Sequence, residues 1–282
     1  MVQEFGGDWT EKKLDRLKKY LIAYQEALKY KPFRKIYIDA FSGSGERCET
    51  LENGEIKFFE GSARIALELE RKFDDYFFIE KNNENCNKLE LLIKEKGAIE
   101  NARICKGDAN VKIPKICENI TKDKIFNRGI VFLDPFACNV SWDIIKIISK
   151  TEILDMWYLF PTGAVLRTMP RNEMQLRNKV GWTDRLNFIF GTEDWRLLYK
   201  QGQQQDLFGY NDFLRANVDE VEDFFHNKLK NLFPFVCEKP MRLLNSNNAP
   251  MFSLFFAASN PSEKAGKLAL NIANHLLRDK KS

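Results

Sequence analysis

Apolar residues near the start of the chain recur at helical spacing. Between Thr10 and Tyr30 they lie three or four positions apart, which places them on one face of an α-helix. They are Leu14, Leu17, Leu21, Tyr24 and Leu28. Pro32 cannot continue a helix, so we expect the helix to end before it.

Short, continuous apolar runs then alternate with helical stretches. The runs IYIDAF, YFFIE, ARICK, IVFLD and ILDMWYLF occupy 36–41, 76–80, 102–106, 130–134 and 153–160. Helices are predicted at 62–73, 83–96, 111–119 and 141–150. Strands that alternate with helices in this way are typical of an α/β fold, in which a parallel sheet is covered on both faces.

The pattern loosens after Pro161. Residues 166–216 are polar, contain several arginines and show few strand signals, so they are predicted to be an insertion. A helical stripe returns over 218–232, and two strand-like runs follow at 235–244 and 251–259. The turn-forming NSNNAP between these runs predicts an antiparallel hairpin. A closing helix is expected to begin near Ser262.

Composition narrows the classes of chemistry. The 282 residues include only two histidines, and the six cysteines contain no C-x-x-C pair, so a metal site or a Ser-His-Asp triad has few candidate residues. The thiols are expected to be reduced and mostly buried. No run of about 18 uncharged apolar residues and no signal peptide is evident, which predicts a cytoplasmic protein without a membrane partner.

The formal charge of +4 is unevenly distributed along the chain. Nine basic and three acidic residues between Glu11 and Lys35 give this segment +6, so the remainder sums to −2. Such a segment is either a phosphate-contacting surface or the solvated polar face of a helix. Arginines of the insertion would extend the first of these surfaces, namely Arg167, Arg171, Arg177 and Arg185.

The ends of the predicted strands carry the candidate site residues, because ligands of open parallel sheets bind beyond the carboxyl ends of the strands. The first strand ends in Asp39 and a turn with Gly43 and Gly45, and glycine allows positive φ and close approach of a ligand. By itself this is compatible with an ordinary turn. Glu80 ends the second strand and can either accept hydrogen bonds from a ribose diol or pair with Lys81.

The third and fourth strand ends complete this pattern. Asp108 can accept a hydrogen bond from an exocyclic amine such as that of adenine, or it can cap the following helix. The fourth strand ends in Asp134-Pro135-Phe136. Together the four ends predict a nucleoside-bearing cofactor that lies across the sheet, with Asp134 at the reacting end.

The glycine turn lacks features that a dinucleotide cofactor requires. A dinucleotide fingerprint needs a third glycine, but Cys48 occupies that position here. The acidic residue of such a fingerprint also lies closer to the glycines than Glu80 does, because 46–61 form an extra polar loop in this chain. The carboxylate of Asp39 would repel a diphosphate but attract an ammonium group. A nicotinamide oxidoreductase is therefore disfavoured.

These motifs resemble class I S-adenosylmethionine-dependent methyltransferases. YIDAFSGSG is similar to their first motif, FIE to the acidic second, GDA to the third, and LDPF to the catalytic D-P-P-Y motif of amino-group methyltransferases. The succession KKYLIAYQEAL, GSARIAL, FFIEKN, GDAN, FLDPFACNVSW and YLFPTGAVLR is similar to the three-Cys-motif partner proteins (TcmP), a prokaryotic family. The resemblance implies a Rossmann-like fold with a mostly parallel seven-stranded sheet, an antiparallel last strand, and extra N- and C-terminal helices.

The resemblance also implies a role for each matched residue. S-adenosylmethionine would be bound by Asp39, Phe41, Gly43, Gly45, Ser62, Glu80, Asp108 and Ala109. Asp134 and the Pro135 carbonyl would accept hydrogen bonds from a substrate amine, and Phe136 would stack on a planar base. The single proline, and Phe in place of the family's Tyr, leave the amine specificity less well defined.

The predicted function is methylation of an amino group on a base of RNA or DNA. The alternative is a methyltransferase-fold protein that acts with a three-Cys-motif protein and has little catalysis of its own. The predicted division, within one domain overall, is a basic N-terminal helix (1–35), the cofactor-binding half of the sheet (36–165), an insertion (166–216), and the remaining sheet with the C-terminal helix (217–282).

Overall fold

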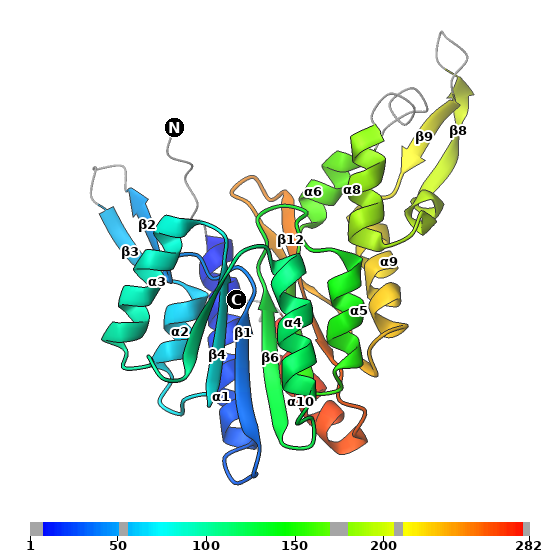
Figure 1. The fold of residues 1–282 in the computed structure, drawn as a ribbon. Helices are drawn as coiled ribbons and strands as arrows, with labels where there is room; N and C mark the ends of the chain where they lie inside the picture. The colour runs from blue at the N-terminus through cyan, green and yellow to red at the C-terminus, as the bar shows by residue number, and fades with distance from the viewer. Residues whose placement is uncertain (1–7, 51–55, 170–179, 206–210, 279–282) are drawn as a thin grey trace.

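The computed structural model describes residues 8–50, 56–169, 180–205 and 211–278, and a single eight-stranded sheet forms its centre (Figure 1). Seven strands follow one another in the order β5 (Ala102–Lys106), β4 (Asp75–Glu80), β1 (Arg34–Asp39), β6 (Asn127–Leu133), β7 (Leu154–Phe160), β12 (Pro250–Ala258) and β10 (Phe235–Val236). The eighth strand, β11 (Met241–Leu244), also pairs with β12. The five strands from β5 to β7 are parallel, and β12 is antiparallel to β7, β10 and β11. The predicted α/β class and the antiparallel hairpin are therefore confirmed.

One predicted strand is divided in two. The run over 235–244 leaves the ladder after Val236 and returns at Met241, so the sheet has eight strands where seven were expected. Pro240 has no N–H with which to pair, and the N–H of Glu238 donates instead to the side chain of Asn274 (3.0 Å).

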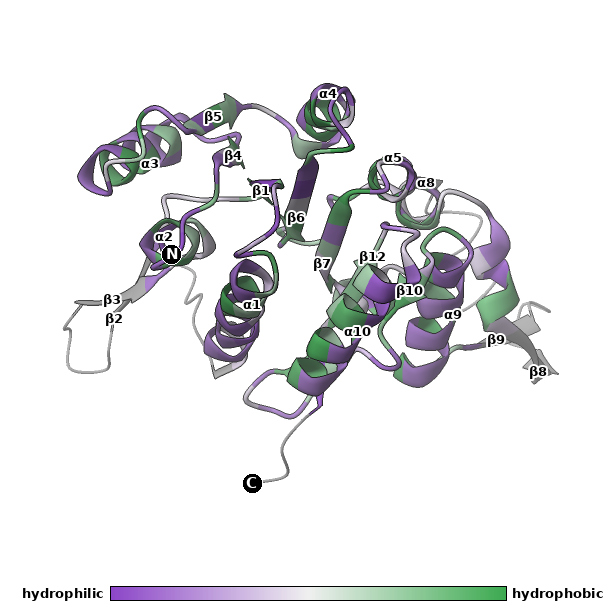
Figure 2. Ribbon diagram, turned by 90° about the horizontal axis from the view of Figure 1, so that it is seen from below, coloured by the Kyte–Doolittle hydropathy of each residue, from purple (hydrophilic) through white to green (hydrophobic). Residues whose placement is uncertain are grey.

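Helices cover both faces of the sheet (Figures 1 and 2). One face carries α1 (Asp8–Ala27), α2 (Ser62–Glu68), α3 (Asn83–Glu95) and α10 (Glu263–Leu277). The other carries α4 (Ala109–Thr121), α5 (Trp142–Lys150) and α9 (Val218–Lys230). None of the helices in the described part of the chain combines the length and the apolar character that a bilayer crossing requires.

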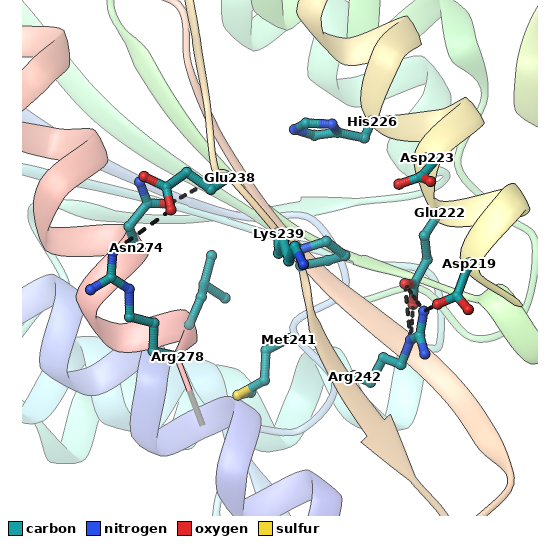
Figure 3. A pocket seen from close by; sticks show the side chains of 12 residues that line it. Asp219, Glu222, Asp223, His226, Glu238, Lys239, Met241, Arg242, Asn274 and Arg278 are labelled. Carbon is teal, nitrogen blue, oxygen red and sulfur yellow. Dashed lines mark hydrogen bonds and ion pairs between the residues drawn. The ribbon is translucent and has the colours of Figure 1, made fainter. Parts of the chain in front are cut away.

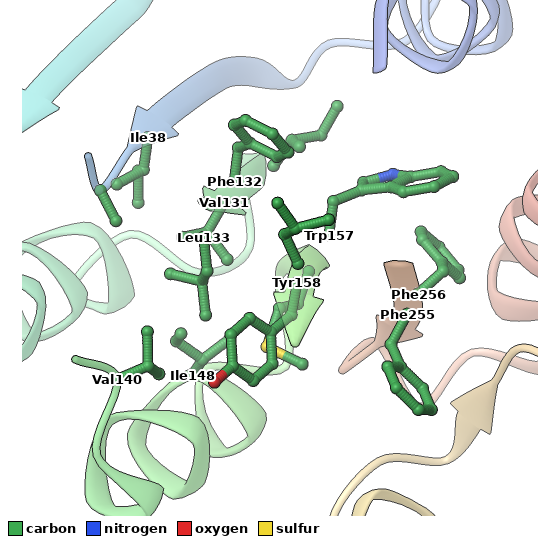
Figure 4. Close-up of a cluster of buried hydrophobic side chains, with 14 of the residues drawn as sticks. Ile38, Val131, Phe132, Leu133, Val140, Ile148, Trp157, Tyr158, Phe255 and Phe256 are labelled. Atoms are coloured by element: carbon green, nitrogen blue, oxygen red, sulfur yellow. The ribbon is translucent and has the colours of Figure 1, made fainter. Parts of the chain in front are cut away.

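Alternating aromatic side chains of the central strands hold these layers together. Trp157 and Phe256 each place a ring 5.1 Å from that of Tyr20 in α1, whereas their neighbours Tyr158 and Phe255 contact Phe225 in α9. Figure 4 shows that the two sets point to opposite faces of the sheet. This is the two-residue alternation of a strand that is buried on both faces, and each such side chain contributes about 1.5–3 kcal/mol when fully buried.

Two hairpins lie at the carboxyl-terminal end of the parallel strands (Figure 1). The first is formed by β2 (Glu46–Thr50) and β3 (Ile56–Glu60), so the prediction that 46–61 form only a loop is wrong. α6 (Thr162–Thr168) begins before the predicted insertion and ends within it. The insertion also contains α8 (Val180–Phe190), a 3-10 helix, η1 (Asp194–Leu198), and a hairpin of β8 (Tyr199–Gln205) and β9 (Asn211–Arg215). The sequence of β8 is polar, so it lacked the apolar alternation that predicts a strand.

The five cysteines whose side chains the structure describes are mostly buried, as predicted. Cys86, Cys105, Cys117, Cys138 and Cys237 are free thiols, and all but Cys105 are buried. Among the described residues, no group of three or more His, Cys, Asp or Glu side chains is arranged to hold a metal ion.

Candidate active site

A cavity of about 500 Å³ lies at the carboxyl ends of the parallel strands. The predicted residues that line it are Phe41, Gly43, Glu80, Asp108, Ala109, Asp134 and Phe136. Four others are buried behind its surface, namely Asp39, Gly45, Ser62 and Pro135. The structure thus brings together residues from four separate strand ends, as the sequence predicted.

The glycine turn after β1 is closed by a glycine from beyond the first hairpin. Gly43 and Gly45 have positive φ angles of 60° and 78°. The N–H of Gly61 donates to the Gly45 carbonyl (2.9 Å), and a Cβ atom on Gly61 would lie 2.8 Å from that backbone. Gly61 directly precedes α2, so a third glycine does pack on this turn, but it comes from beyond the hairpin and not from position 48.

Asp39 is fully buried beside this turn. Its carboxylate accepts long hydrogen bonds from the N–H of Phe41 (3.3 Å) and the hydroxyl of Tyr37 (3.4 Å). Burial and the neighbouring charge of Asp134 raise its pKa to about 7, against the lowering effect of hydrogen bonds from Ser62, Phe41 and Tyr37. Asp39 therefore carries a negative charge only part of the time near neutral pH.

Asp134, the residue after β6, holds a lysine of the N-terminal helix. Lys13 Nζ lies 2.5 Å from Asp134 Oδ2, and the two side chains are 7% and 20% exposed. The same ammonium lies 5.0 Å from the centre of the Trp9 ring. Lys13 is therefore bound to Asp134 inside the protein and is not part of an exposed basic surface.

A sequence signal for this placement existed. Lys13 precedes Leu17 by four residues and therefore belongs to the stripe that faces the sheet. A lysine in that stripe needs a buried acidic partner, and Asp134 is the partner that the fold supplies.

Three acidic residues from outside the basic segment, Asp134, Glu60 and Asp75, offset part of its +6 charge. Six of its nine cations form ion pairs, which are Lys13–Asp134, Arg16–Asp15, Lys18–Glu60, Lys19–Asp15, Lys29–Glu26 and Arg34–Asp75. Exposed pairs of this kind add little stability, but they reduce the local positive field.

The two acidic strand-end residues on the nucleoside side have local partners. Glu80 Oε1 accepts the N–H of Asn82 (2.6 Å), and no ion pair of Glu80 with Lys81 occurs in the described part of the chain. Asp108 Oδ1 accepts the N–H of Asn110 (2.8 Å) and caps α4, as the alternative reading predicted. Because both residues also line the cavity, capping does not remove Asp108 from the site.

The acceptor side of the cavity combines aromatic and basic groups. Phe136 is 62% exposed, and Phe188 of α8, which the sequence analysis missed, is 38% exposed; both line the cavity. Arg185 lines it too, and with Arg167 it lies close enough to Cys138 to lower the pKa of that thiol, although burial raises this pKa to about 11. Arg171 and Arg177 lie outside the described residues.

The loop that carries Phe136 is fixed from two sides. Asn110 donates to the Asn139 carbonyl (2.9 Å) and accepts the N–H of Ser141 (3.0 Å), while Arg185 donates to the Cys138 carbonyl (3.1 Å). Ala137 within the loop has a φ of 58°, a strained conformation for a residue with a side chain. Arg185 therefore supports this loop, a role that its assignment to a phosphate patch did not predict.

A larger cavity of about 740 Å³ lies between α9 and α10, at the sheet edge formed by β10 and β11 (Figure 3). Its charges largely satisfy one another, since Arg242 pairs with Asp219 and Glu222, and His226 Nε2 lies 2.7 Å from the Cys237 carbonyl oxygen. None of the strand-end residues lines this cavity, so it is a weaker candidate for the active site.

No protein-family model matches the chain, and no curated protein matches it. Among solved structures, protein LPL1258 from Legionella pneumophila strain Philadelphia 1, described with the family model DUF519, has a TM-score of 0.54 at 14% identity, over 96% of this chain and 93% of its own. This likeness shows a shared fold. Together with the strand order, it gives a Rossmann-like α/β fold with antiparallel C-terminal strands.

Two further solved structures are less similar. An RNA methyltransferase from Salinibacter ruber in complex with S-adenosyl-L-homocysteine aligns with 50% of this chain and 73% of its own, at 13% identity and a TM-score of 0.27. The N-terminal domain of EvdMO1 with SAH bound aligns over 86% and 79%, at 10% identity and a TM-score of 0.38. These two likenesses are too weak to carry an argument about function.

Proposed function

We propose that the protein is an S-adenosylmethionine-dependent methyltransferase that acts on an amino group of a nucleic-acid base. The observation that carries this proposal is the Asp134 carboxylate, which lines a cavity with an exposed aromatic ring and two acidic strand ends and already binds the ammonium group of Lys13 at 2.5 Å. A site that binds one primary amine at the end of β6 has the polarity required to bind another.

The residues around the cavity fit the proposed cofactor. Gly43 leaves open space where a Cβ atom would meet nothing within 4 Å, and Glu80 and Asp108 present carboxylates at the next two strand ends. Glu80 would accept hydrogen bonds from the ribose hydroxyls, and Asp108 with Ala109 would contact the adenine. When bound, the cofactor supplies an electrophilic methyl group.

The methionine portion would lie against the glycine turn. Phe41 and Gly43 face the cavity, whereas Asp39, Gly45 and Ser62 support the turn from behind. A buried carboxyl at Asp39 disfavours a diphosphate at this position, even though Gly61 supplies a third glycine.

In this proposal the substrate amine replaces Lys13 at Asp134. The carboxylate and the Pro135 carbonyl would accept its two N–H groups and so orient the nitrogen lone pair toward the methyl group. S-adenosylhomocysteine would be the leaving group, and the surplus proton of the methylated nitrogen would pass to the Asp134 carboxylate. Catalysis then depends on positioning and electrostatics, because a base amine needs no strong general base. Lys13 must move away from the carboxylate before the acceptor can bind.

The acceptor is proposed to be a base that is unstacked from its neighbours. Phe136 and Phe188 offer two aromatic surfaces on one side of the cavity, and Arg167 and Arg185 lie nearby. Aromatic stacking combined with basic groups is typical of contacts to single-stranded or flipped bases.

The second candidate function is a binding protein that retains the cofactor site and acts with a three-Cys-motif protein. The specific observation in its favour is again the Lys13–Asp134 pair, because it occupies the catalytic carboxylate with a cation from the same chain. Membership of the three-Cys-motif partner family and a cytoplasmic location belong to the same proposal.

Methyl transfer from labelled S-adenosylmethionine to total RNA, DNA and protein tests the proposal. Asp134→Asn should lower transfer at least about 100-fold, the scale expected when one key transition-state contact is lost, while leaving the affinity for S-adenosylhomocysteine nearly unchanged. Asp143→Asn, at an exposed position of α5, is the matched control.

The outcomes separate the candidates. S-adenosylhomocysteine binding without transfer that depends on Asp134 would favour the binding protein. Calorimetry that shows tighter binding of NAD than of S-adenosylhomocysteine would refute the cofactor assignment.

A further inference from the structure

A third cavity lies between α1 and α10, at the end of the sheet opposite to the strand-end cavity. Its volume is about 190 Å³, which is room for about six water molecules at ~30 Å³ each. Aromatic side chains of Tyr20, Tyr24 and Phe33 form one part of its lining, and Asp155 at the start of β7 forms another. Figure 2 shows α1 and α10 side by side on this face of the sheet.

The carboxylate of Asp155 is buried here without a cation bound to it. The residue is 8% exposed, and its Oδ2 accepts a hydrogen bond from the Tyr20 hydroxyl (2.7 Å). Burial raises the pKa of Asp155 to about 7. Asp155 forms no ion pair within the described residues, although Arg128 lies close enough to lower this pKa partially.

Arg128 is committed to other partners. Its guanidinium donates to the carbonyls of Lys124 (2.8 Å) and Asn127 (2.6 Å) and lies 4.3 Å from the centre of the Phe33 ring. It therefore forms a wall of the cavity and leaves the Asp155 carboxyl without an ion-pair partner among the described residues.

A hydroxyl group lining the same cavity is also unsatisfied. The oxygen of Tyr24 is buried and has no hydrogen-bond partner in the described part of the protein. A buried hydroxyl of this kind costs about 1–3 kcal/mol when it stays unpaired. The side chains that α10 contributes are small or apolar, and the only hydroxyl beside them in the lining belongs to Ser262, the residue before the helix. The lining residues of α10 are Ala265, Gly266, Leu268, Ala269 and Ile272, and none of them titrates.

We infer that this cavity is a ligand site for a small organic ammonium ion. A buried carboxylate provides the counter-charge, aromatic faces attract a cation through their quadrupoles, and the Tyr24 hydroxyl supplies a further polar contact. The site is remote from the strand-end cavity and shares none of its lining residues. The inference therefore stands apart from the proposed methyl transfer.

Benzylamine is a suitable probe, because it joins an ammonium group to a flat apolar ring. Benzyl alcohol and benzoate have similar shapes but are neutral and negative. Protein NMR titrations near pH 7.5 should show benzylamine binding at least tenfold more tightly than either analogue, with shifts confined to residues around the cavity. Equal binding of benzyl alcohol would overturn the inference.

Two substitutions probe the groups directly. Asp155→Asn keeps an acceptor for Tyr20 but removes the charge, and it should weaken benzylamine at least tenfold while leaving benzyl alcohol unchanged. Tyr24→Phe removes only the unpaired hydroxyl and should weaken benzylamine about threefold. Asp143→Asn is the matched control and should bind as the unaltered protein does.

The folding of each variant is checked by circular dichroism and by its melting temperature. If Asp155→Asn does not fold, Tyr24→Phe and the order of the three probes still decide the question. Unchanged benzylamine affinity in both variants would refute the site. S-adenosylhomocysteine titrated into the same samples reports on the other cavity, so failure of one proposal is distinguishable from failure of the other.

Discussion

Asp39 and Asp155 are two buried aspartates on the α1 face of the sheet, at opposite ends of it. Burial raises the pKa of each to about 7. Asp39 receives hydrogen bonds from three donors and lies beside the Asp134 carboxylate, whereas Asp155 has one tyrosine donor and aromatic neighbours. Two buried aspartates thus lie in different surroundings, which are polar around Asp39 at one end of the sheet and largely apolar around Asp155 at the other.

Helix α1 reaches both of these environments with one face. Lys13 contacts Asp134 near its start, and Tyr20 contacts Asp155 near its end. Tyr24, which also lines the cavity beside Asp155, is eleven positions after Lys13, about 16 Å along a helix axis. A stripe that was predicted only to cover the sheet therefore contributes polar side chains to two separate carboxylates, Asp134 and Asp155.

The largest expected effect separates both aspartates from ordinary ones. An unfolded aspartate loses its proton near pH 4, but these two keep theirs until about pH 7, so their stabilising contribution is complete below pH 4 and lost as pH rises to 7. From about pH 5 to pH 8, each should cost the protein about 2–3 kcal/mol. Urea unfolding at both pH values should show a smaller loss in Asp39→Asn and in Asp155→Asn. If one of these variants loses as much stability between the two pH values as the unaltered protein does, the two sites are not equivalent in burial.

The next effect concerns the ion pair of Asp134, since Asp155 has no ion pair in the described part of the chain. Lys13→Met should destabilise the protein by about 2 kcal/mol, because it leaves Asp134 without its partner in a largely buried position. The double variant Lys13→Met/Asp134→Asn should recover most of that loss in a double-mutant cycle measured by urea unfolding. Lys18→Met breaks an exposed pair with Glu60 and should cost less than about 0.5 kcal/mol. If the coupling energy between Lys13 and Asp134 is below about 0.5 kcal/mol, this pair behaves as a surface pair.

The smallest effect distinguishes an aromatic ring at each end. Phe136 is 62% exposed, so Phe136→Ala should change stability by less than about 0.5 kcal/mol but raise the KM for a nucleic-acid substrate about tenfold. Phe33 supports Arg128, so Phe33→Ala should cost about 1 kcal/mol without changing that KM. Equal changes in KM would refute the proposed division of roles.

The fold was largely predictable because its buried strands are continuous apolar runs. The run over 102–106 became β5 with the predicted bounds, and 153–160 became β7 with one residue fewer. The hairpin β8–β9 was missed because its polar strands show no apolar alternation. The split of 235–244 depends on Pro240 and on a tertiary bond to Asn274, which no local pattern reveals.

The site was predictable only where strands supply it. Parallel strands end at one edge, so Glu80, Asp108 and Asp134 had to lie near one another once the strand order was right. Lys13, Gly61 and Phe188 reach the site through tertiary packing. Of these, only Lys13 had a sequence signal, its place in the apolar stripe of α1.

The contact between Gly45 and Gly61 also makes the chain divisible at this point. Glu46 and Glu60 are paired residues of β2 and β3, so the hairpin leaves and rejoins the turn at adjacent positions. The segment between them is therefore a natural place to shorten the protein or to graft a reporter domain beside the cavity. Either change would leave the strand, turn and helix that frame the cavity connected through the same two glycines.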